Sequence, residues 1–532
     1  MKVNERLISL IVTAVLILTL GFIYIFSYRF GWQWLDSDIS SGIVLGRFLA
    51  DENVILSAKW IYGNEIHIIH QTMFMIPLFK LFGHYENWAL IRSLTILLNH
   101  LVLLLSYIFL MKSLKLKTIW ILISGLFLLM PISPMYWDSI TFSGSYILFI
   151  AQLFFCLGFF VRLVFHPDSI KPSRINLIFF LLFSFFLGVY GIRSFLVFYI
   201  PLLLSCAYLW FWKKKFPLLL GCGGFIACCA GYVLNHFLHV WFTFASFEGA
   251  VQLDSFFSNF LPKLGRCLAA LPVFFGFSAG SVLLSVKGFF SVISIFIAIA
   301  MIYLICKIFR AARLQNNAIG ITQELSFVTV FFVFSLAFNI FVFIIISHPV
   351  TERFFVPFMV FYIPLAALFF EYSEKHFKQF KRWAIICGIS LFVIAQGCLN
   401  FMDLRVKDSN SLRQPYMQYL LDNDLDYGFA THWNANVTSE LSNGKVNIAG
   451  LQAIMRPGAS SNMFLLNRSL IPSKYFNPLF HPEESFLLLN REEWTVVSGR
   501  RVFSGLKPDY EDANFIILRF PSSEIIHRDF IY

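Results

Sequence analysis

Long apolar runs alternate with short polar connections over roughly the first four hundred of the 532 residues. A run of about 18 or more apolar residues is long enough to cross a bilayer as a helix. Eleven such runs predict membrane spans, near residues 7–28, 88–111, 119–135, 145–165, 175–191, 195–212, 217–235, 288–306, 325–347, 353–371 and 383–402. The predicted fold class is therefore a polytopic α-helical membrane protein with about 11 transmembrane helices.

The sequence becomes polar and rich in turn residues after residue 402. Short apolar runs such as SFLLLN at 485–490 and ANFIILRF at 513–520 predict strands, and QPYMQYLLDNDL at 414–425 predicts a helix. A tail of this length can form a small core of its own. We therefore predict two domains, a transmembrane domain over 1–402 and a C-terminal α/β domain over 403–532.

The basic connections predict the orientation. Lys and Arg gather in alternate loops, for example KSLKLK at 112–117, KKK at 213–215 and EKHFKQFKR at 374–382. Cytoplasmic loops carry such an excess of positive charge. We expect a multi-pass protein of the cell membrane with a cytoplasmic N-terminus. The first loop (29–87), a second loop (236–287) and the C-terminal domain are then extracytoplasmic.

One apolar segment, 267–284, does not fit this alternation. Counting it as a span would place the basic sequence KIFRAAR at 307–313 outside. Its Pro and Gly content favours a re-entrant or surface-lying element.

Composition excludes several function classes. The chain is 58% hydrophobic and only 13% charged, and its net charge of +11 is explained by the loops that set orientation, so we expect no nucleic-acid partner. The nine cysteines form no CxxC pair and indicate small apolar residues. No phosphate-binding, dinucleotide-binding or nucleophile-elbow motif occurs.

The first loop opens on WLDSD, directly after the first apolar run. Apolar residues then recur at roughly helical spacing, which predicts amphipathic helices lying at the membrane interface. Such a loop can cover a cavity between membrane helices. Asp36, Asp38, Glu65, His67 and His70 would lie on its polar side.

Three acids share the predicted outer face, namely Asp36, Asp38 and Asp138, the last in the next outer loop. A solvated carboxylate at a helix end is the simpler interpretation of any one of them. A carboxylate held near an apolar surface, however, can have a raised pKa and act as a general base. We prefer Asp38 slightly as the base; in the alternative, Asp36 faces the site and Asp38 caps the next helix at Ile39.

Arg193 and Arg353 lie on the same face, against the charge bias of the loops. Pairing with lipid headgroups would explain them, and so would binding the phosphate of an anionic lipid substrate, because Arg donates two parallel hydrogen bonds to phosphate oxygens. No zinc motif occurs. A divalent cation held by Asp36 or Asp138 together with substrate phosphates is the one cofactor we consider.

This layout resembles the membrane-embedded glycosyltransferases of the GT-C fold. The resemblance comprises the acidic pair after span one, the helical first loop, an acid in the second outer loop, about eleven spans and an outer C-terminal domain. The segment from WLDSD to HIIHQ also resembles uncharacterised membrane proteins that are similar to the serotype-converting glucosyltransferase II group. The chain lacks the WWD-type signature of oligosaccharyltransferases, so the pattern does not favour transfer to protein asparagine.

The resemblance implies an enzyme that moves a hexose from a polyprenyl-phosphate carrier to an envelope glycan on the outer face. A first-loop Asp would be the base of an inverting transfer, Asp138 the second acid, and Arg193 and Arg353 the contacts to the carrier phosphate. The segment THWNANVTSE offers Trp433 to an acceptor glycan, although an ordinary loop is the simpler interpretation. The alternatives are a transporter or polymerase of polysaccharide or lipid-linked glycan, or a non-enzymatic envelope protein.

Overall fold

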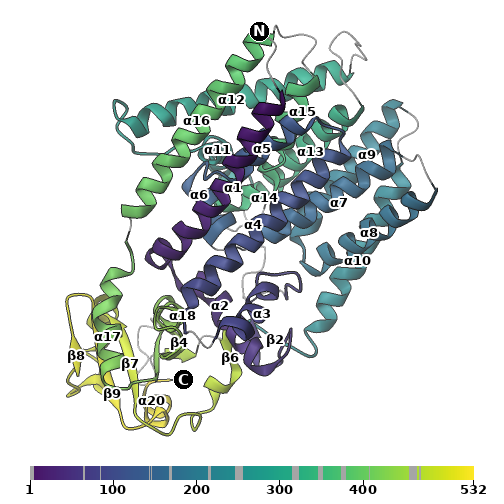
Figure 1. Cartoon of the computed structure of the whole chain (residues 1–532). Helices are drawn as coiled ribbons and strands as arrows, with labels where there is room; N and C mark the ends of the chain where they lie inside the picture. Colours follow the sequence, from purple (N-terminus) through teal and green to yellow (C-terminus); the bar gives the residue numbers. More distant parts are fainter. Residues whose placement is uncertain are drawn as a thin grey trace.

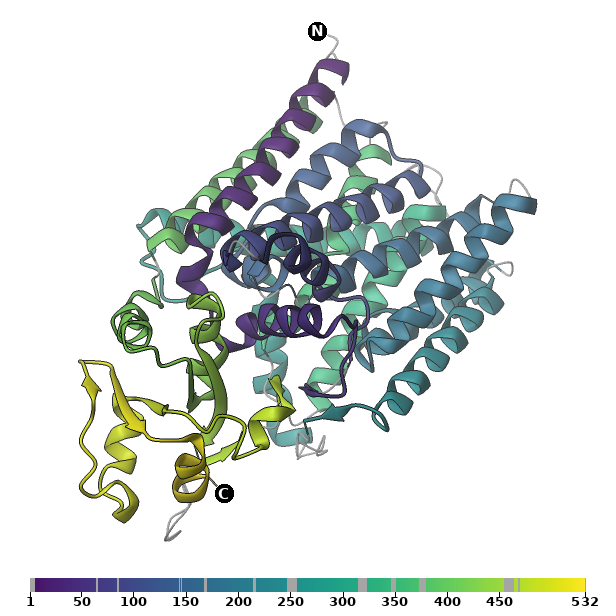
Figure 2. The ribbon, with the colours of Figure 1, turned by 60° about the horizontal axis from the view of Figure 1, so that its bottom comes forward.

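Helices make up the first four hundred residues of the chain and a mixed sheet organises the last hundred. The structure is a computed structural model. It describes residues 5–63, 66–83, 86–142, 144, 146–166, 170–213, 217–245, 256–313, 323–345, 351–372, 379–406, 408–453, 464–466 and 469–531. The long helices run side by side as a bundle, with the N-terminus at one end and the C-terminal domain beyond the other (Figures 1 and 2). We call the end of the bundle next to the C-terminal domain the domain end.

The α-helices of the bundle and of its loops are as follows: α1 (Glu5–Phe30), α2 (Ser37–Glu52), α3 (Thr72–Phe82), α4 (Trp88–Ser113), α5 (Thr118–Leu129), α6 (Pro134–Trp137), α7 (Ile147–Phe165), α8 (Ile170–Val189), α9 (Ile200–Lys213), α10 (Leu218–Leu238), α11 (Phe256–Phe274), α12 (Val286–Arg313), α13 (Gln323–Ile345), α14 (Val356–Met359), α15 (Tyr362–Tyr372) and α16 (Gln379–Val406). Short helical turns of other types join them, namely η1 (Gly31–Trp34), η3 (Asp138–Phe142), η4 (Phe195–Tyr199) and η6 (Glu352–Phe355).

Within the described residues, eight helices are long and apolar enough to cross a membrane. They coincide with eight of the eleven predicted runs. The runs 175–191 and 195–212 are shorter apolar helices, Arg174–Val189 and Phe195–Phe211. The run 119–135 is a bent pair that counts as a ninth span if it is taken as one. The chain is therefore a multi-pass membrane protein, as predicted.

The bent pair matters for the position of Asp138. Helix α5 ends at Leu129, and the next helical segment, Pro134–Phe142, departs from its direction by 93°. Pro131 lacks the amide hydrogen that a continuing helix needs, and Pro134 is well placed at the first position of α6. Ser133 caps α6 by accepting a hydrogen bond from the Tyr136 amide. The bend turns the chain across the bundle just before Asp138.

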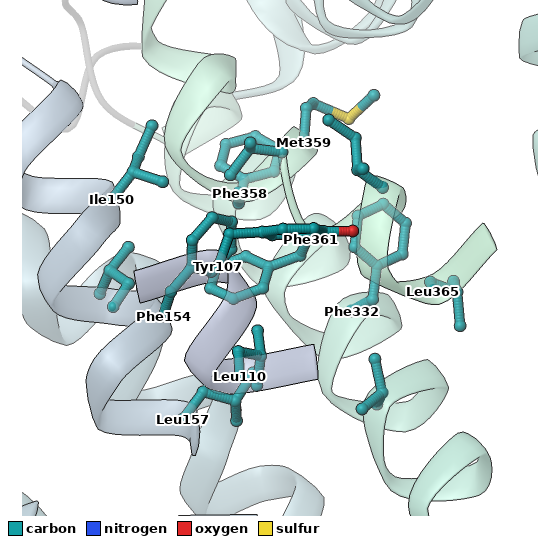
Figure 3. Packing of buried hydrophobic residues seen from close by; sticks show 14 of the residues in the cluster. Tyr107, Leu110, Ile150, Phe154, Leu157, Phe332, Phe358, Met359, Phe361 and Leu365 are labelled. Carbon is teal, nitrogen blue, oxygen red and sulfur yellow. The ribbon is translucent and has the colours of Figure 1, made fainter. Parts of the chain in front are cut away.

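Aromatic side chains fill the core of the bundle. Tyr107 of α4 packs against Phe154 of α7 at a ring distance of 5.5 Å, and Phe154 meets Phe361 at 5.4 Å. Phe332 and Leu365 complete this part of the core from α13 and α15 (Figure 3). Each fully buried side chain of this size contributes about 1.5–3 kcal/mol against exposure to water, although in lipid the gain is packing rather than the hydrophobic effect.

The segment 267–284 is part helix and part turn. Helix α11 ends at Phe274, and the chain then turns until α12 begins at Val286. It is not among the candidate spans within the described residues, in agreement with the prediction that it does not cross the membrane.

A small sheet fastens three distant segments together at the domain end. Strand β1 (Trp60–Tyr62) of the first loop pairs in parallel with β2 (Thr243–Phe244) and in antiparallel with β6 (Ile471–Pro472). These strands come from the three regions that the charge pattern assigns to the outer face. Trp60 and Ile61 are buried in this sheet. The three regions therefore lie together, on one side of the bundle.

The C-terminal domain is built on a six-stranded sheet in the order β5-β4-β3-β7-β9-β8. Its elements are α17 (Gln414–Asp422), β3 (Tyr427–Thr431), α18 (His432–Leu441), β4 (Asn447–Ala453), β5 (Phe464–Leu466), β7 (Ser485–Asn490), α19 (Arg491–Val497), β8 (Tyr510–Glu511), β9 (Phe515–Phe520) and α20 (Ser523–Phe530). Strands β4, β3 and β7 are parallel, and the outer pairs are antiparallel. Strands β7 and β9 and helix α17 fall on the predicted segments.

Both faces of this sheet are covered, as a parallel arrangement requires. Because successive side chains point to opposite faces, Leu487 and Leu489 join one apolar cluster while Phe486 and Leu488 join the other. Helices α19 and α20 cover the first face, and α17 and α18 cover the second. The segment THWNANVTSE is thus the N-cap and all but the last residue of helix α18, and not a loop.

Candidate active site

The first acid of WLDSD begins a helix. Asp36 is the N-cap of α2, and its Oδ1 accepts a hydrogen bond of 2.8 Å from the Ile39 amide. The capping role that we considered for Asp38 therefore belongs to Asp36. Burial, and to a smaller extent the negative charge of Asp38, raise the pKa of the Asp36 carboxyl above its ordinary value. One oxygen of Asp36 is held in place, and the group is a stronger base than a solvated aspartate.

The second acid contacts the C-terminal domain. His432, the first residue of α18, donates a hydrogen bond of 2.9 Å from Nε2 to Oδ1 of Asp38. This bond, together with the positive charge of Arg353, lowers the pKa of the Asp38 carboxyl. Helix α18 packs along α2, so a residue 394 positions away completes the surroundings of the acidic pair.

The Asp38–His432 contact gives a stability prediction. A carboxyl whose pKa is lowered in the folded state stabilises the fold above its unfolded pKa of about 3.9, and this contribution is lost as pH falls through the lowered value. Asp38 is half exposed, so the contribution is at most about 0.5 kcal/mol after screening. Asp38→Asn should lower the unfolding temperature slightly at pH 7 and by less at pH 3, which lies below the unfolded-state pKa. An equal difference at both pH values would contradict this assignment.

A pocket of about 520 Å³ opens beside Asp36. Asp138, at the start of η3, lines the same pocket, so the bend after α5 brings together two acids that lie far apart in sequence. Arg413 and Trp433 close it from the C-terminal domain. The remaining lining residues are Trp34, Leu35, Ile39, Pro134, Met135, Trp137, Phe142, Leu404 and Ser409.

The two predicted arginines lie close together at the domain end. Arg353 of η6 lies over the ring of Phe354 at 5.6 Å, and Arg193 lies over the same ring at 6.0 Å. Arg193 also lies 4.9 Å from the ring centre of Tyr146. The effect of Arg353 on Asp38 places this pair near the start of α2. The result is a cluster of positive charge near Asp38.

Two histidines of the first loop lie behind Arg193. His67 stacks on Tyr190 at 4.0 Å, and its ring is 5.9 Å from that of His70. Burial lowers the pKa of His70 to about 4, and burial with the charges of His70 and Arg193 lowers that of His67. Both rings are therefore neutral at pH 7 and add hydrogen-bonding groups without adding charge. Glu65, the other first-loop candidate, lies outside the described residues.

Glycine allows the first loop to approach the segment after Asp138. The amide of Gln71 lies between Gly42 of α2 and Gly144, which has a φ of 59°. A Cβ on Gly42 would be 2.3 Å from Nε2 of Gln71, and one on Gly144 would be 2.5 Å from its Oε1. Glycine at both positions lets α2 and the Asp138 segment share one site.

No group of three or more His, Cys, Asp or Glu side chains in the described part of the chain is arranged to hold a metal ion. Sequence reasoning missed His432 and Arg413 as site residues. Both come from the C-terminal domain, and no local motif marks either of them. Only the pairing of α18 with α2 reveals their position.

Neither protein-family models nor curated protein sequences match this chain. Among solved structures, ArnT from Cupriavidus metallidurans bound to undecaprenyl phosphate superposes on 95% of this chain and 97% of its own, with a TM-score of 0.54. The fold is ArnT-like. The sequence identity is 11%. The apo form of ArnT has the same identity and a TM-score of 0.44, and it covers 95% of this chain and 98% of its own.

The ArnT-like fold extends over nearly the whole of both chains, the C-terminal α/β domain included. It confirms the predicted class, a polytopic GT-C-like membrane protein with a C-terminal α/β domain. At this identity the similarity concerns the fold, and the roles of individual residues must be argued from the site itself.

Proposed function

We propose that this protein is a membrane glycosyltransferase that moves a sugar from a polyprenyl-phosphate carrier to an envelope glycan on the outer face. The observation that carries the proposal is the convergence of Asp36 and Asp138 on one pocket, at the end of the bundle where Arg193 and Arg353 lie. The ArnT-like fold, solved for ArnT with undecaprenyl phosphate bound, supports the carrier class.

Arg193 and Arg353 would hold the phosphate of the carrier. Guanidinium groups match phosphate oxygens with paired, charge-assisted hydrogen bonds. Aromatic rings hold both arginines, which reduces the conformational entropy lost when phosphate binds. Neutral His67 and His70 would support the site without repelling the arginines.

An apolar groove of about 540 Å³ offers a place for the isoprenoid tail. It lies between α5, α11, α12, α15 and α16 and is lined almost entirely by aromatic and aliphatic side chains, such as Phe275, Phe296 and Tyr362. Ile132, one of its lining residues, lies two positions before α6, the helix that leads into the turn with Asp138. A tail in this groove would therefore place its headgroup near the acids.

The reaction would be an inverting displacement with Asp36 as base. The acceptor oxygen bonds to the anomeric carbon as the bond from that carbon to the carrier phosphate oxygen breaks. The hydroxyl proton passes to the Asp36 carboxylate, and polyprenyl phosphate leaves with the electron pair, stabilised by the arginines. We choose Asp36 over Asp38 because Asp36 lines the pocket and its pKa is raised, whereas the Asp38 carboxylate already accepts a hydrogen bond from His432.

The orientation is part of the proposal. The N-terminus lies at the end opposite the site, and the first loop, the second loop and the C-terminal domain meet at the domain end (Figure 2). With a cytoplasmic N-terminus, as the basic loops favour, the site and the acceptor are extracytoplasmic.

Deletion in the native host is the direct test. Surface glycan from the deletion strain should lack one sugar substituent, and the full chain should restore it. Purified protein in lipid nanodiscs should also release labelled sugar from its undecaprenyl-phosphate donor. Unchanged glycan composition in the deletion strain would remove the proposal.

Arg353→Ala should raise the KM for the lipid-linked donor by about 10- to 100-fold, because this range corresponds to the binding free energy of one or two charged hydrogen bonds. Arg353→Lys should recover part of the loss, because it keeps the charge but not the planar fork. Arg405→Ala is the matched control, since Arg405 is also exposed and lies 5.6 Å from a phenylalanine ring, that of Phe30. An equal change in both variants would argue against phosphate binding by Arg353.

A further inference from the structure

The connectivity of the C-terminal sheet marks a place for a ligand. From β3 the chain passes through α18 to β4 on one side, and it later returns to β7 on the other side of β3. The strand order therefore reverses between β3 and β7. In open α/β sheets ligands bind at the carboxyl ends of the strands beside such a reversal. Strand β3 ends at Thr431; of the next two residues, His432 is hydrogen-bonded to Asp38 of α2 and Trp433 lines the pocket beside Asp36.

Trp433 is unusually exposed for a tryptophan next to a domain contact. Its exposed fraction is 59%, although its neighbour His432 is bonded to Asp38 and the rest of α18 is largely buried against α2. Its ring meets His432 edge to face at 5.2 Å and lines the pocket that contains Asp36 and Asp138. Tryptophan is mostly buried in folded proteins, so one exposed at a polar pocket indicates a contact surface.

The backbone beneath Trp433 is held in place. Arg413 donates from Nη2 to the Trp433 carbonyl at 3.4 Å and to Oδ1 of Asn434 at 3.1 Å. The segment before it is fixed in turn, because Nδ2 of Asn410 donates to the Leu35 carbonyl at 2.9 Å. These hydrogen bonds connect the backbone at Trp433 to Leu35, the residue that precedes Asp36. A binding surface built in this way loses little entropy when a ligand arrives.

We propose that this pocket is a subsite for one uncharged sugar ring, stacked on Trp433 with its hydroxyls directed to Asp36 and Asp138. The apolar C–H face of a hexose matches the indole, and the carboxylates accept hydrogen bonds from hydroxyls. Two carboxylates against the one guanidinium of Arg413, which already donates hydrogen bonds to Trp433 and Asn434, disfavour an acidic sugar. That this ring belongs to the acceptor rests on the proposed function; that the pocket binds a sugar does not.

Saturation-transfer NMR on the full chain in detergent tests the subsite without donor or turnover. The probes are methyl β-glucoside, methyl N-acetyl-β-glucosaminide and methyl β-glucuronide. At least one of the two neutral glycosides should bind with a millimolar Kd, and the glucuronide should bind at least tenfold more weakly. Trp433→Ala should weaken neutral-sugar binding at least tenfold, whereas Trp433→Phe, which keeps an aromatic face, should stay within about threefold. Trp241→Ala is the matched control, because Trp241 is 64% exposed and does not line the pocket.

Three results would overturn the subsite: no neutral glycoside bound by the wild type, unchanged binding in Trp433→Ala, or equal binding of the glucuronide. Thermal unfolding of each variant separates loss of the pocket from loss of the fold, and Trp433→Phe decides the matter if Trp433→Ala is destabilised. Sugar binding without donor turnover would remove the proposed function and leave the subsite as a glycan-binding site. Donor turnover without sugar binding would remove the subsite and leave the proposed function in place.

Discussion

Asp36→Asn should reduce sugar transfer by a factor of about 10² to 10⁴, the usual contribution of a general base. Asparagine can still accept the hydrogen bond from the Ile39 amide, so the start of α2 should stay intact. The loss should therefore appear in kcat at normal protein level. Because the pKa of Asp36 is raised, wild-type activity should already decline on the acid side at a pH above the usual aspartate value of about 3.9, where the base becomes protonated.

Asp51→Asn is the control on the same helix, because Asp51 is exposed, pairs with Arg47 at 2.9 Å and is remote from the pocket. Its transfer rate should match that of the wild type. Asp38→Asn should have a smaller effect than Asp36→Asn, since Asp38 acts next to the base and not as the base. Wild-type surface glycan in both the Asp36→Asn and the Asp38→Asn strains, at normal expression, would rule out the mechanism.

Glu440→Gln should destabilise the protein by about 3–5 kcal/mol, the cost of leaving a buried charge without its partner. Glu440 of α18 accepts two hydrogen bonds from Arg92 of α4, and both side chains are almost completely buried. Arg92 also donates to the Ile39 carbonyl, in the first turn of α2. The variant should unfold at a lower temperature, and its C-terminal domain should be cleaved faster by protease.

Two companion variants isolate this effect. Glu511→Gln removes one partner of an exposed ion pair with Arg491 and should cost less than about 1 kcal/mol. The double variant Arg92→Met with Glu440→Leu replaces the buried pair by apolar side chains and should recover most of the stability. If Glu440→Gln unfolds at the same temperature as Glu511→Gln, the pair does not hold the domain in place.

Most of the fold could be predicted because it depends on local pattern. Apolar runs mark the spans, and β7 is buried at every position but its last, so its sequence has a continuous apolar run from Phe486 to Leu489. The exceptions have local physical causes that length alone does not show. Pro131 and Pro134 bend one predicted span at its end, and two other runs form helices too short to count as spans.

The site could be predicted only in part. The predicted topology places Asp36, Asp138, Arg193 and Arg353 on one face, and in the structure Asp36 and Asp138 line one pocket while Arg193 and Arg353 share the ring of Phe354; their roles stay predictions. Whether Asp36 or Asp38 faces the pocket depends on which of the two caps helix α2. In the structure Asp36 makes the capping hydrogen bond. His432 is hydrogen-bonded to Asp38, 394 positions away in the sequence. Hydrophobic periodicity gives no information about contacts between residues so far apart in sequence.

The sheet that joins β1, β2 and β6 sets a time order for assembling the candidate site. Strand β6 (Ile471–Pro472) follows β1 by about 410 positions, since Ile61 pairs with Ile471, so all of the chain between them has been synthesised before β1 can pair with β6. Helix α18, whose His432 is hydrogen-bonded to Asp38, is also synthesised late. Membrane insertion of the spans can therefore precede assembly of the pocket beside Asp36, and a chain whose translation stops before β6 would occupy the membrane without its C-terminal domain complete.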